Sequence, residues 1–365
     1  MSYSLIIVGK SLMLNQPFME YIKNSLKEYS LEIESISFLD KSDNNFFIKL
    51  EESIDRSDKT VIISQNKDFN FVNKVLSTLT SDKLELIDDM LIPSKALQYD
   101  KNSYIIKKSE TLINVISVSE NSTIPKILFE KEETFKTFNI IGIDEDSIKL
   151  LLEPLSSNYE IKLLISSLVD GWNKICAVTT KYGDLENFLK SVQSLFPDKF
   201  IAEENVVKHI VSKLELYGKK LSVVESCTGG LISSILTKHS GVSSVFDGAI
   251  VSYSNNIKRS WLGVDKTTLD TFGAVSEACV REMLEGVLNA SSADYAIATS
   301  GIAGPTGGTK EKPVGTVFVG AKAKNGNTII ERLLLKGDRE YIQTQSAYYA
   351  FKLLLITDKQ YFFGK

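Results

Sequence analysis

The chain has 365 residues, of which 43% are hydrophobic and 24% are charged, and its formal net charge is −4 at pH 7. This length exceeds one ordinary hydrophobic core, so two or three domains are expected in a soluble globular protein. The slightly acidic balance argues against a nucleic-acid-binding surface that covers the whole protein.

The three cysteines, Cys176, Cys227 and Cys279, lie too far apart in the sequence for a zinc motif or a disulfide framework. The chain begins without a signal-peptide pattern and has no apolar run of about 18 residues. We therefore expect a cytoplasmic protein with no membrane association, no metal and no cofactor. His209 and His239 lie in polar helical contexts and are expected at the surface, which disfavours histidine-based catalysis.

Strands and helices alternate in the first part of the chain, which predicts a parallel sheet with helices on both faces. The expected strands are 4–8, 31–39 and 60–64, and the expected helices are 17–29, 46–54 and 71–79. Beyond Leu84 the pattern loosens, and we expect two strands of an irregular insertion, at 104–107 and 112–118, and then a loop at 120–125. Residues 1–135 are taken as the first α/β domain.

A second, smaller domain is expected over residues 136–202. Its predicted strands are 138–141, 159–166 and 175–180, and its predicted helices are 144–155 and 184–195. This order is typical of a small α+β module of the split-βαβ kind. A helix predicted over 203–217 leads into a third domain, residues 203–365.

The third domain holds 17 of the 21 glycines, which favours it as the place of the chemistry because glycine allows tight turns and close backbone approach to a ligand. A buried strand is predicted at 221–224, and a helix at 231–238. Between them, polar side chains and the pair Gly229-Gly230 form a turn whose backbone N–H groups are suited to an anion.

Further elements of the third domain surround three more polar segments. Strands are predicted at 249–253, 295–299 and 316–320, and helices at 277–290, after the cap Ser276, and at 339–355, after the cap Asp338. A turn is expected at Ser254-Asn255-Asn256, just before Lys258, and a glycine-rich loop at 300–308.

Four motifs of the third domain follow one another in a characteristic order. They are 225–230, 253–255 with Lys258, 299–308 with 312–316, and 337–339. Together they closely resemble the C-terminal domain of the CinA family, the competence/damage-inducible proteins. The resemblance covers the chain from about residue 203 to its end. It implies an α/β domain that acts as a nicotinamide-nucleotide amidase, converting nicotinamide mononucleotide and water to nicotinate mononucleotide and ammonia.

The earlier domains resemble the same family less closely. Residues 138–155 and 200–207 are similar to its middle domain, and residues 1–135 resemble its molybdopterin-binding-like N-terminal domain in outline. Where the family carries a Gly-Gly-Leu-Gly-Pro-Thr run and an Asp-Asp pair, this chain has Ser64-Gln65-Asn66-Lys67-Asp68-Phe69-Asn70. We therefore expect a degenerate N-terminal domain without the ADP-ribose pyrophosphatase activity associated with it.

Amide hydrolysis needs a nucleophile, a proton shuttle and donors for an oxyanion. Without a well-placed histidine, Lys258 is the expected base if burial lowers its pKa, and Tyr253 is expected to orient it or to cover the pyridine ring. Ser226, at the end of the strand, is the first candidate nucleophile, and Ser243 is the second. Cys227 is the third, within a Glu225-Lys258-Cys227 arrangement, although a small buried apolar role suits it better.

The remaining candidates are expected to bind the nucleotide substrate and its phosphate. They are Glu225, Thr228, Gly229, Gly230, Thr299, Ser300, Gly301, Gly304, Gly307, Gly308 and Arg339. Arg339 stands out because a cation in the first turn of a helix opposes the helix dipole unless an anion lies nearby. We expect a homo-oligomer, a dimer, and no nucleic-acid partner. The alternatives are a non-enzymatic partner in DNA uptake or recombination and, less favoured, an ADP-ribose pyrophosphatase.

Overall fold

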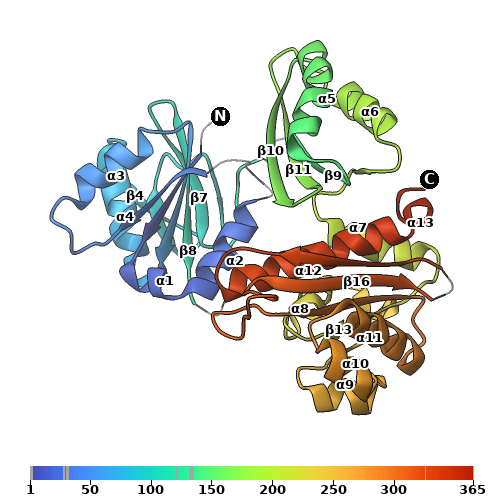
Figure 1. Ribbon diagram of the computed structural model, residues 1–365. Helices are drawn as coiled ribbons and strands as arrows, with labels where there is room; N and C mark the ends of the chain where they lie inside the picture. Colours follow the sequence, from blue (N-terminus) through green and yellow to red (C-terminus); the bar gives the residue numbers. More distant parts are fainter. Residues whose placement is uncertain are drawn as a thin grey trace. The chain divides into compact units, whose positions relative to one another are not determined.

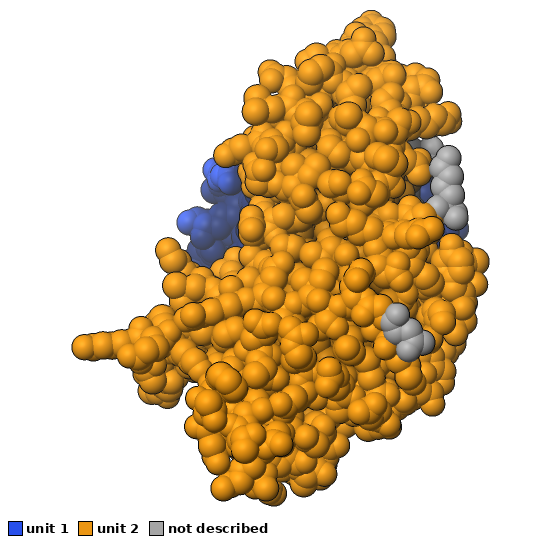
Figure 2. All heavy atoms as spheres, turned by 45° about the vertical axis from the view of Figure 1, so that its right-hand side comes forward, with its two compact units in different colours: residues 1–133 blue, residues 134–365 orange. Residues whose placement is uncertain are grey.

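The computed structural model describes residues 3–27, 29, 33–120, 122–130, 135–324 and 326–364. They form a mixed α/β protein, which confirms the predicted fold class, and the chain divides into two compact units, 1–133 and 134–365 (Figure 2). Within this described part, no helix combines the length and the apolar character needed to cross a membrane.

Unit 1 contains a six-stranded sheet in the order β2-β1-β3-β8-β7-β6, in which the first four strands are parallel. Its strands are β1 (Tyr3–Val8), β2 (Ile33–Leu39), β3 (Lys59–Gln65), β6 (Gln98–Asp100), β7 (Ser103–Lys108) and β8 (Thr111–Val118). A separate hairpin consists of β4 (Leu84–Ile87) and β5 (Met90–Pro93). The strands predicted at 104–107 and 112–118 are present as β7 and β8. The prediction that they belong to an irregular insertion is wrong, because residues 112–118 of β8 pair with β3 and both strands extend the main sheet.

Helices cover both faces of this sheet, as predicted. They are α1 (Lys10–Leu14), α2 (Gln16–Leu26), α3 (Phe46–Ile54) and α4 (Asn66–Leu79). The apolar residues of α2 pack in one core, and those of α3 and α4 pack in another. Glu28 in the predicted helix, Leu31 and Glu32 in the predicted strand, and Asn121 in the predicted loop lie outside the described residues.

Helix α4 begins at Asn66, five residues before the predicted start. Gln65 at its N-cap is extended, and Asp68 places an acidic side chain in the first turn, where the helix dipole favours it. The stretch 64–70 is therefore the end of β3 and the first turns of α4.

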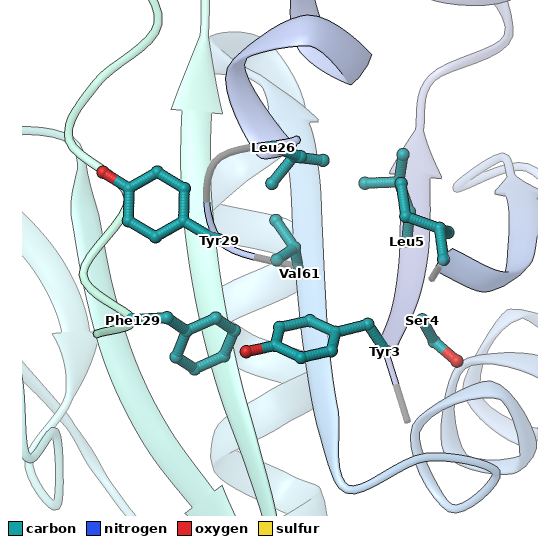
Figure 3. Close-up of a pocket in the computed structure, with 8 residues that line it drawn as sticks. Tyr3, Ser4, Leu5, Leu26, Tyr29, Val61 and Phe129 are labelled. Atoms are coloured by element: carbon teal, nitrogen blue, oxygen red, sulfur yellow. The ribbon is translucent and has the colours of Figure 1, made fainter. Parts of the chain in front are cut away.

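A small apolar cavity lies in the α2-side core of unit 1. Figure 3 shows Tyr3, Leu26, Tyr29, Val61 and Phe129 around it. Its volume of about 10 Å³ is at the lower limit for a single water molecule, so it is a packing gap and no ligand site.

Unit 2 contains two sheets, of which the first has four strands in the order β10-β11-β9-β12 with antiparallel pairing throughout. Its elements are β9 (Phe135–Ile141), α5 (Glu145–Asn158), β10 (Ile161–Val169), β11 (Trp172–Thr179), α6 (Leu185–Leu195) and β12 (Phe200–Ile201). This βαββαβ arrangement agrees with the predicted split-βαβ module. Val169, Trp172 and Ile201 share one hydrophobic core with residues beyond 203, so a boundary at residue 202 stays a prediction.

The second sheet of unit 2 has the order β14-β13-β15-β16-β17, with β13, β14 and β15 parallel. Its strands are β13 (Leu221–Glu225), β14 (Phe246–Val251), β15 (Tyr295–Gly301), β16 (Thr316–Ala323) and β17 (Thr328–Leu334). The helical elements are α7 (Val206–Leu216), α8 (Leu231–Thr237), η1 (Val242–Ser244), α9 (Asn255–Leu262), α10 (Lys266–Phe272), α11 (Glu277–Ala290), α12 (Arg339–Thr357) and α13 (Lys359–Phe363).

The alternation of side chains along β15 explains the layers of this sheet. Tyr295 and Ile297 point into the core shared with α12, whereas Ala296 and Ala298 point into the core shared with α11. Helix α12 therefore packs on one face, where Figure 1 shows it in red, and α11 packs on the other. The carboxyl ends of the three parallel strands meet at one edge, which is where open α/β sheets bind ligands.

His209 in α7 is buried, so the prediction that it lies at the surface is wrong. Its Nδ1 lies 3.0 Å from Glu203 Oε2, and its Nε2 lies 2.8 Å from the backbone oxygen of Phe362 in α13. These two contacts satisfy the ring in the interior, which the polar residues around it in the sequence did not indicate.

Candidate active site

A pocket of about 360 Å³ opens at the carboxyl edge of β13, β14 and β15. Three chain segments that follow these strands form most of its wall, and the first residue of α12 completes it. The lining residues are Ser226, Cys227, Tyr253, Asn255, Lys258, Ala274, Val275, Ser300, Gly301, Ile302, Ala303, Gly304, Thr306, Gly307 and Arg339.

Ser226 and Lys258 meet inside this pocket. Lys258 Nζ lies 2.9 Å from Ser226 Oγ and 2.5 Å from the backbone oxygen of Ser252. Lys258 is 1% exposed and Ser226 is 9% exposed, so little water competes for either group. A neutral amine at this position can accept the hydroxyl proton through its lone pair while it still donates to the Ser252 carbonyl.

Lys258 lies on helix α9, and the prediction of a turn at 254–256 is therefore wrong beyond Ser254. Ser254 caps the helix by accepting a hydrogen bond of 3.2 Å from Ile257 N. Burial lowers the pKa of Lys258 below its usual value. The positive end of the α9 dipole also opposes a cation near the first turn, which favours the neutral amine further.

Cys227 lines the pocket, but its thiol is unsuited to nucleophilic attack. The residue is 5% exposed, and burial raises the pKa of the thiol to about 12. The thiolate, which is the reactive form of cysteine, is therefore scarce at neutral pH. The structure supports the apolar role of Cys227 that the sequence favoured.

Glu225 is fully buried and outside the pocket lining, contrary to the prediction that it binds substrate. Its carboxylate caps helix α8: Oε2 accepts from Gly230 N at 3.0 Å and from Ile232 N at 3.1 Å. Oε1 accepts from the backbone N and the Oγ of Ser233, at 2.9 and 2.6 Å. Helix α8 thus receives its anion from the chain itself, and the predicted Glu225-Lys258-Cys227 arrangement does not form.

Four other predicted binding residues, three in this turn and one in β15, are absent from the pocket lining. Gly229 and Gly230 have φ values of 61° and 103°, which glycine adopts without strain and which bend the chain from β13 into α8. Thr228 Oγ1 lies 2.8 Å from Thr299 Oγ1, and both side chains are buried. The two glycines thus shape the turn, and the two threonines bind each other in the interior.

Ser243 is exposed on η1, just before β14 begins, and is not among the residues that line the pocket, contrary to its predicted catalytic role. Lys258 follows the opposite end of β14. A six-residue strand rises by roughly 20 Å, so Ser243 is separated from the pocket by the length of the sheet. Of the three candidate nucleophiles, Ser226 is the one whose side chain lies within hydrogen-bonding distance of Lys258 Nζ and whose reactivity burial does not suppress as it does for Cys227.

Arg339 crosses one side of the pocket and connects two of its loops. Its Nη1 donates to the Gly304 carbonyl at 2.6 Å, and its Nη2 donates to Tyr253 Oη at 3.0 Å. Tyr253 is 63% exposed, so it forms part of the rim, and its hydroxyl is bound by Arg339, whereas Lys258 Nζ binds Ser226 and Ser252. Gly301, Gly304 and Gly307, three of the predicted substrate-binding glycines, line the pocket, whereas Gly308 does not.

Ser300 lines the pocket, and its Oγ donates to the Ala274 carbonyl at 2.8 Å. This bond connects β15 to the segment before α11, which the sequence analysis did not assign to the site. Six lining residues were not named as site residues: Asn255, Ala274, Val275, Ile302, Ala303 and Thr306. Four of them belong to the motifs 253–255 and 299–308, whereas Ala274 and Val275 lie outside every motif, because small or apolar side chains carry no chemical signal in a sequence.

Unit 1 has a polar pocket of about 420 Å³ near the ends of β3 and β8, beside the stretch where the family's glycine run is absent. Ser117 Oγ donates to Asn66 Oδ1 at 2.5 Å, and Asn66 Nδ2 donates to Ser119 Oγ at 2.6 Å. Hydrogen bonds between side chains thus occupy this edge. Among the described residues, no group of three or more His, Cys, Asp or Glu side chains is placed to hold a metal ion.

The known proteins that this chain resembles carry CinA or competence/damage-inducible names. Residues 203–357 match the model of the CinA C-terminal domain. A CinA-like protein of Thermosipho melanesiensis is 46% identical over 178 residues, which cover 48% of this chain and 44% of that protein. A competence-damage inducible protein of a Thermoanaerobacter species is 36% identical over 273 residues, covering 68% of this chain and 64% of the relative. The chain thus spans about half to two thirds of the length of these relatives.

Among solved structures, the competence/damage inducible protein CihA from Agrobacterium tumefaciens is 40% identical. The match covers 42% of this chain and 93% of that protein, with a TM-score of 0.41.

Proposed function

Because the chain belongs to the CinA family, we propose that its pocket in unit 2 hydrolyses the carboxamide of nicotinamide mononucleotide to nicotinate mononucleotide and ammonia. The observation that carries this proposal is the contact of 2.9 Å between the buried Lys258 Nζ and Ser226 Oγ. A serine hydroxyl needs an adjacent base to attack an amide, and a lysine with a lowered pKa supplies one.

In the first half-reaction, Ser226 Oγ attacks the carboxamide carbon while the neutral Nζ of Lys258 takes the hydroxyl proton. Cys227 directly follows the nucleophile. In strand-to-helix turns, the backbone N–H of this next residue commonly stabilises the oxyanion. Lys258 then passes its proton to the leaving nitrogen. Ammonia departs, and an ester between Ser226 and the nicotinoyl group remains.

In the second half-reaction, water attacks this ester and Lys258 accepts the proton of the water. The ester bond breaks, Lys258 returns the proton to Ser226 Oγ, and the carboxylic acid that forms releases its remaining proton to solvent, so that nicotinate mononucleotide leaves as a carboxylate. One lysine thus acts as base and then as acid in each half, which requires a pKa nearer to neutrality than that of an exposed lysine.

The phosphate of the substrate is assigned to Arg339. A guanidinium has five N–H donors, and the bonds to Gly304 and Tyr253 use two of them. The other N–H groups can bind the phosphate. The loop that contains Gly304 and Gly307 adds backbone N–H groups beside it. Tyr253, held by Arg339, is positioned to cover the pyridine or the ribose.

The test is a substrate panel with the purified protein, in which ammonia and nucleotide products are measured separately. We expect ammonia and nicotinate mononucleotide from nicotinamide mononucleotide, and none with Ser226→Ala. Release of AMP from ADP-ribose without deamidation would favour the pyrophosphatase alternative. Tight binding of DNA or of a partner protein, with no turnover of any substrate, would favour the non-enzymatic alternative.

A further inference from the structure

Gln343, on helix α12, contacts the chain segment that carries Ser226. Its Nε2 donates to the backbone oxygen of Cys227 at 2.8 Å, although the two residues are 116 positions apart. Residues 226–229 form a β-turn, closed by the hydrogen bond from Gly229 N to Ser226 O at 3.2 Å. Gln343 therefore binds the carbonyl of the central peptide of this turn.

The orientation of that central peptide decides the geometry of the turn. Types I and II differ by a rotation of this peptide, and type II requires a positive φ at the third residue. The third residue here is Thr228, which is not among the residues with positive φ and which, being β-branched, avoids that conformation. The conformation of Thr228 restrains one end of this peptide, and the hydrogen bond from Gln343 restrains its carbonyl oxygen.

Two other sets of hydrogen bonds hold the ends of the turn without involving α12. Ser226 N donates to Thr299 O at 3.0 Å, which fixes the start of the turn on β15. The Glu225 carboxylate fixes the helix that follows the turn. Gln343 adds a side-chain hydrogen bond between the middle of the turn and α12.

Helix α12 also carries Arg339, one helical turn before Gln343. Residues four apart lie on the same helix face, so the side chain assigned to the substrate phosphate and the anchor of the nucleophile turn project toward the same site. One rigid helix thus sets the distance between the proposed phosphate position and Ser226.

From these contacts we propose that Gln343 is a positioning residue for the hydrolysis. It holds the 226–229 turn so that Ser226 Oγ stays aligned with Lys258 and with an amide whose phosphate is bound at Arg339. This inference rests on the proposed function of the pocket. Gln343 itself touches neither reacting group, and its effect passes through the carbonyl of Cys227.

The test separates the donor from the shape of the side chain. Gln343→Met keeps the length and loses the donor, whereas in Gln343→Arg the Nε–H lies the same number of bonds from Cα as Nε2 of glutamine. We expect Gln343→Met to lower kcat by up to about 100-fold, the scale of a small misplacement of a reacting group, with KM nearly unchanged. Gln343→Arg should recover most of the loss.

Gln345→Met is the matched control. Gln345 lies on the same helix and also donates to a backbone carbonyl, that of Lys336, at 2.8 Å, but it has no contact with the 226–229 turn. Its replacement should leave kcat near that of the unaltered protein. An equal fall in both methionine variants, a normal kcat in Gln343→Met, or a Gln343→Arg variant as slow as Gln343→Met would overturn the proposal.

A second readout does not depend on the substrate. The rate at which a fluorophosphonate labels Ser226, followed by mass spectrometry, reports the alignment of the nucleophile alone. If the unaltered protein is labelled but releases no ammonia from nicotinamide mononucleotide, the proposed substrate is wrong, and slower labelling of Gln343→Met still supports the positioning role. A Ser226 that is neither labelled nor needed for turnover contradicts both proposals.

Discussion

Lys258 Nζ lies 2.9 Å from Ser226 Oγ, although the two residues follow different strands. Ser226 comes directly after β13, and Lys258 lies in α9, after β14. Because β13 and β14 are parallel neighbours, their carboxyl ends lie side by side and bring the two segments together. The carbonyl of Ser252 accepts a second hydrogen bond from Nζ, which fixes the direction of the amine.

The pH dependence of kcat/KM should report the base. Activity should rise with pH, because the neutral amine of Lys258 is the active form. Since burial lowers its pKa, the rise should be complete below the ordinary lysine value of about 10.4. A profile that falls as the pH increases through the neutral range would show that the protonated form is required and would contradict a lysine base.

Cys227 should resist alkylation. With a thiol pKa of about 12, only about one molecule in 10,000 carries the thiolate at pH 8. Iodoacetamide at pH 8 should therefore leave the activity intact, and Cys227→Ala should keep most of kcat. If iodoacetamide modifies Cys227 and inactivates the protein rapidly, and if substrate prevents this, the nucleophile is Cys227 and the serine mechanism is wrong.

Arg339→Ala should weaken substrate binding more than it slows the chemistry. A hydrogen bond to a charged group contributes about 1.5–3 kcal/mol, so KM should rise about 10- to 150-fold with a smaller change in kcat. Arg281→Ala is the control, because Arg281 is exposed and pairs with Glu277 on its own helix, at 2.7 Å. An unchanged KM in Arg339→Ala would mean that the phosphate lies elsewhere.

Glu225→Gln should destabilise unit 2. The carboxylate accepts four hydrogen bonds at the start of α8, and an amide nitrogen in place of one oxygen leaves donors unpaired in the interior. The free energy of unfolding in urea should fall by about 1.5–3 kcal/mol. Glu215→Gln, at an exposed position of α7, should change it by less than about 0.5 kcal/mol. Equal stability of the two variants would contradict the capping role.

Much of the fold could be predicted because local signals and packing agree. Helices α11 and α12 begin at the predicted residues, since Ser276 and Asp338 cap them as ordinary N-cap side chains do. Helix α9 was missed because its sequence, Asn255–Leu262, is mostly polar and follows a turn signal at Ser254. A helix that buries only Lys258 and Leu262 carries too weak an apolar pattern for periodicity to indicate it.

The site shows the same division. Ser226 and Lys258 could be identified because strand ends and glycines mark their motifs. The role of Glu225 could not be identified. Its carboxylate accepts from N–H groups five to eight residues later in the chain, and the bend at Gly229 and Gly230 brings these groups to it. The bond from Gln343 to Cys227 joins distant parts of the chain, which no local pattern reports.

The most direct test of the central claim is kcat for nicotinamide mononucleotide in Ser226→Ala, Lys258→Ala and the double variant. If the serine and the lysine act as one unit, each single change should lower kcat by about 10²–10⁴-fold or more, and the double variant should be no slower than the worse single one. Lys258→Arg should fail as well, because arginine keeps its proton, whereas Ser243→Ala should turn over normally. Independent, additive losses, or a Ser226→Ala variant that retains turnover, would contradict a Ser226–Lys258 mechanism.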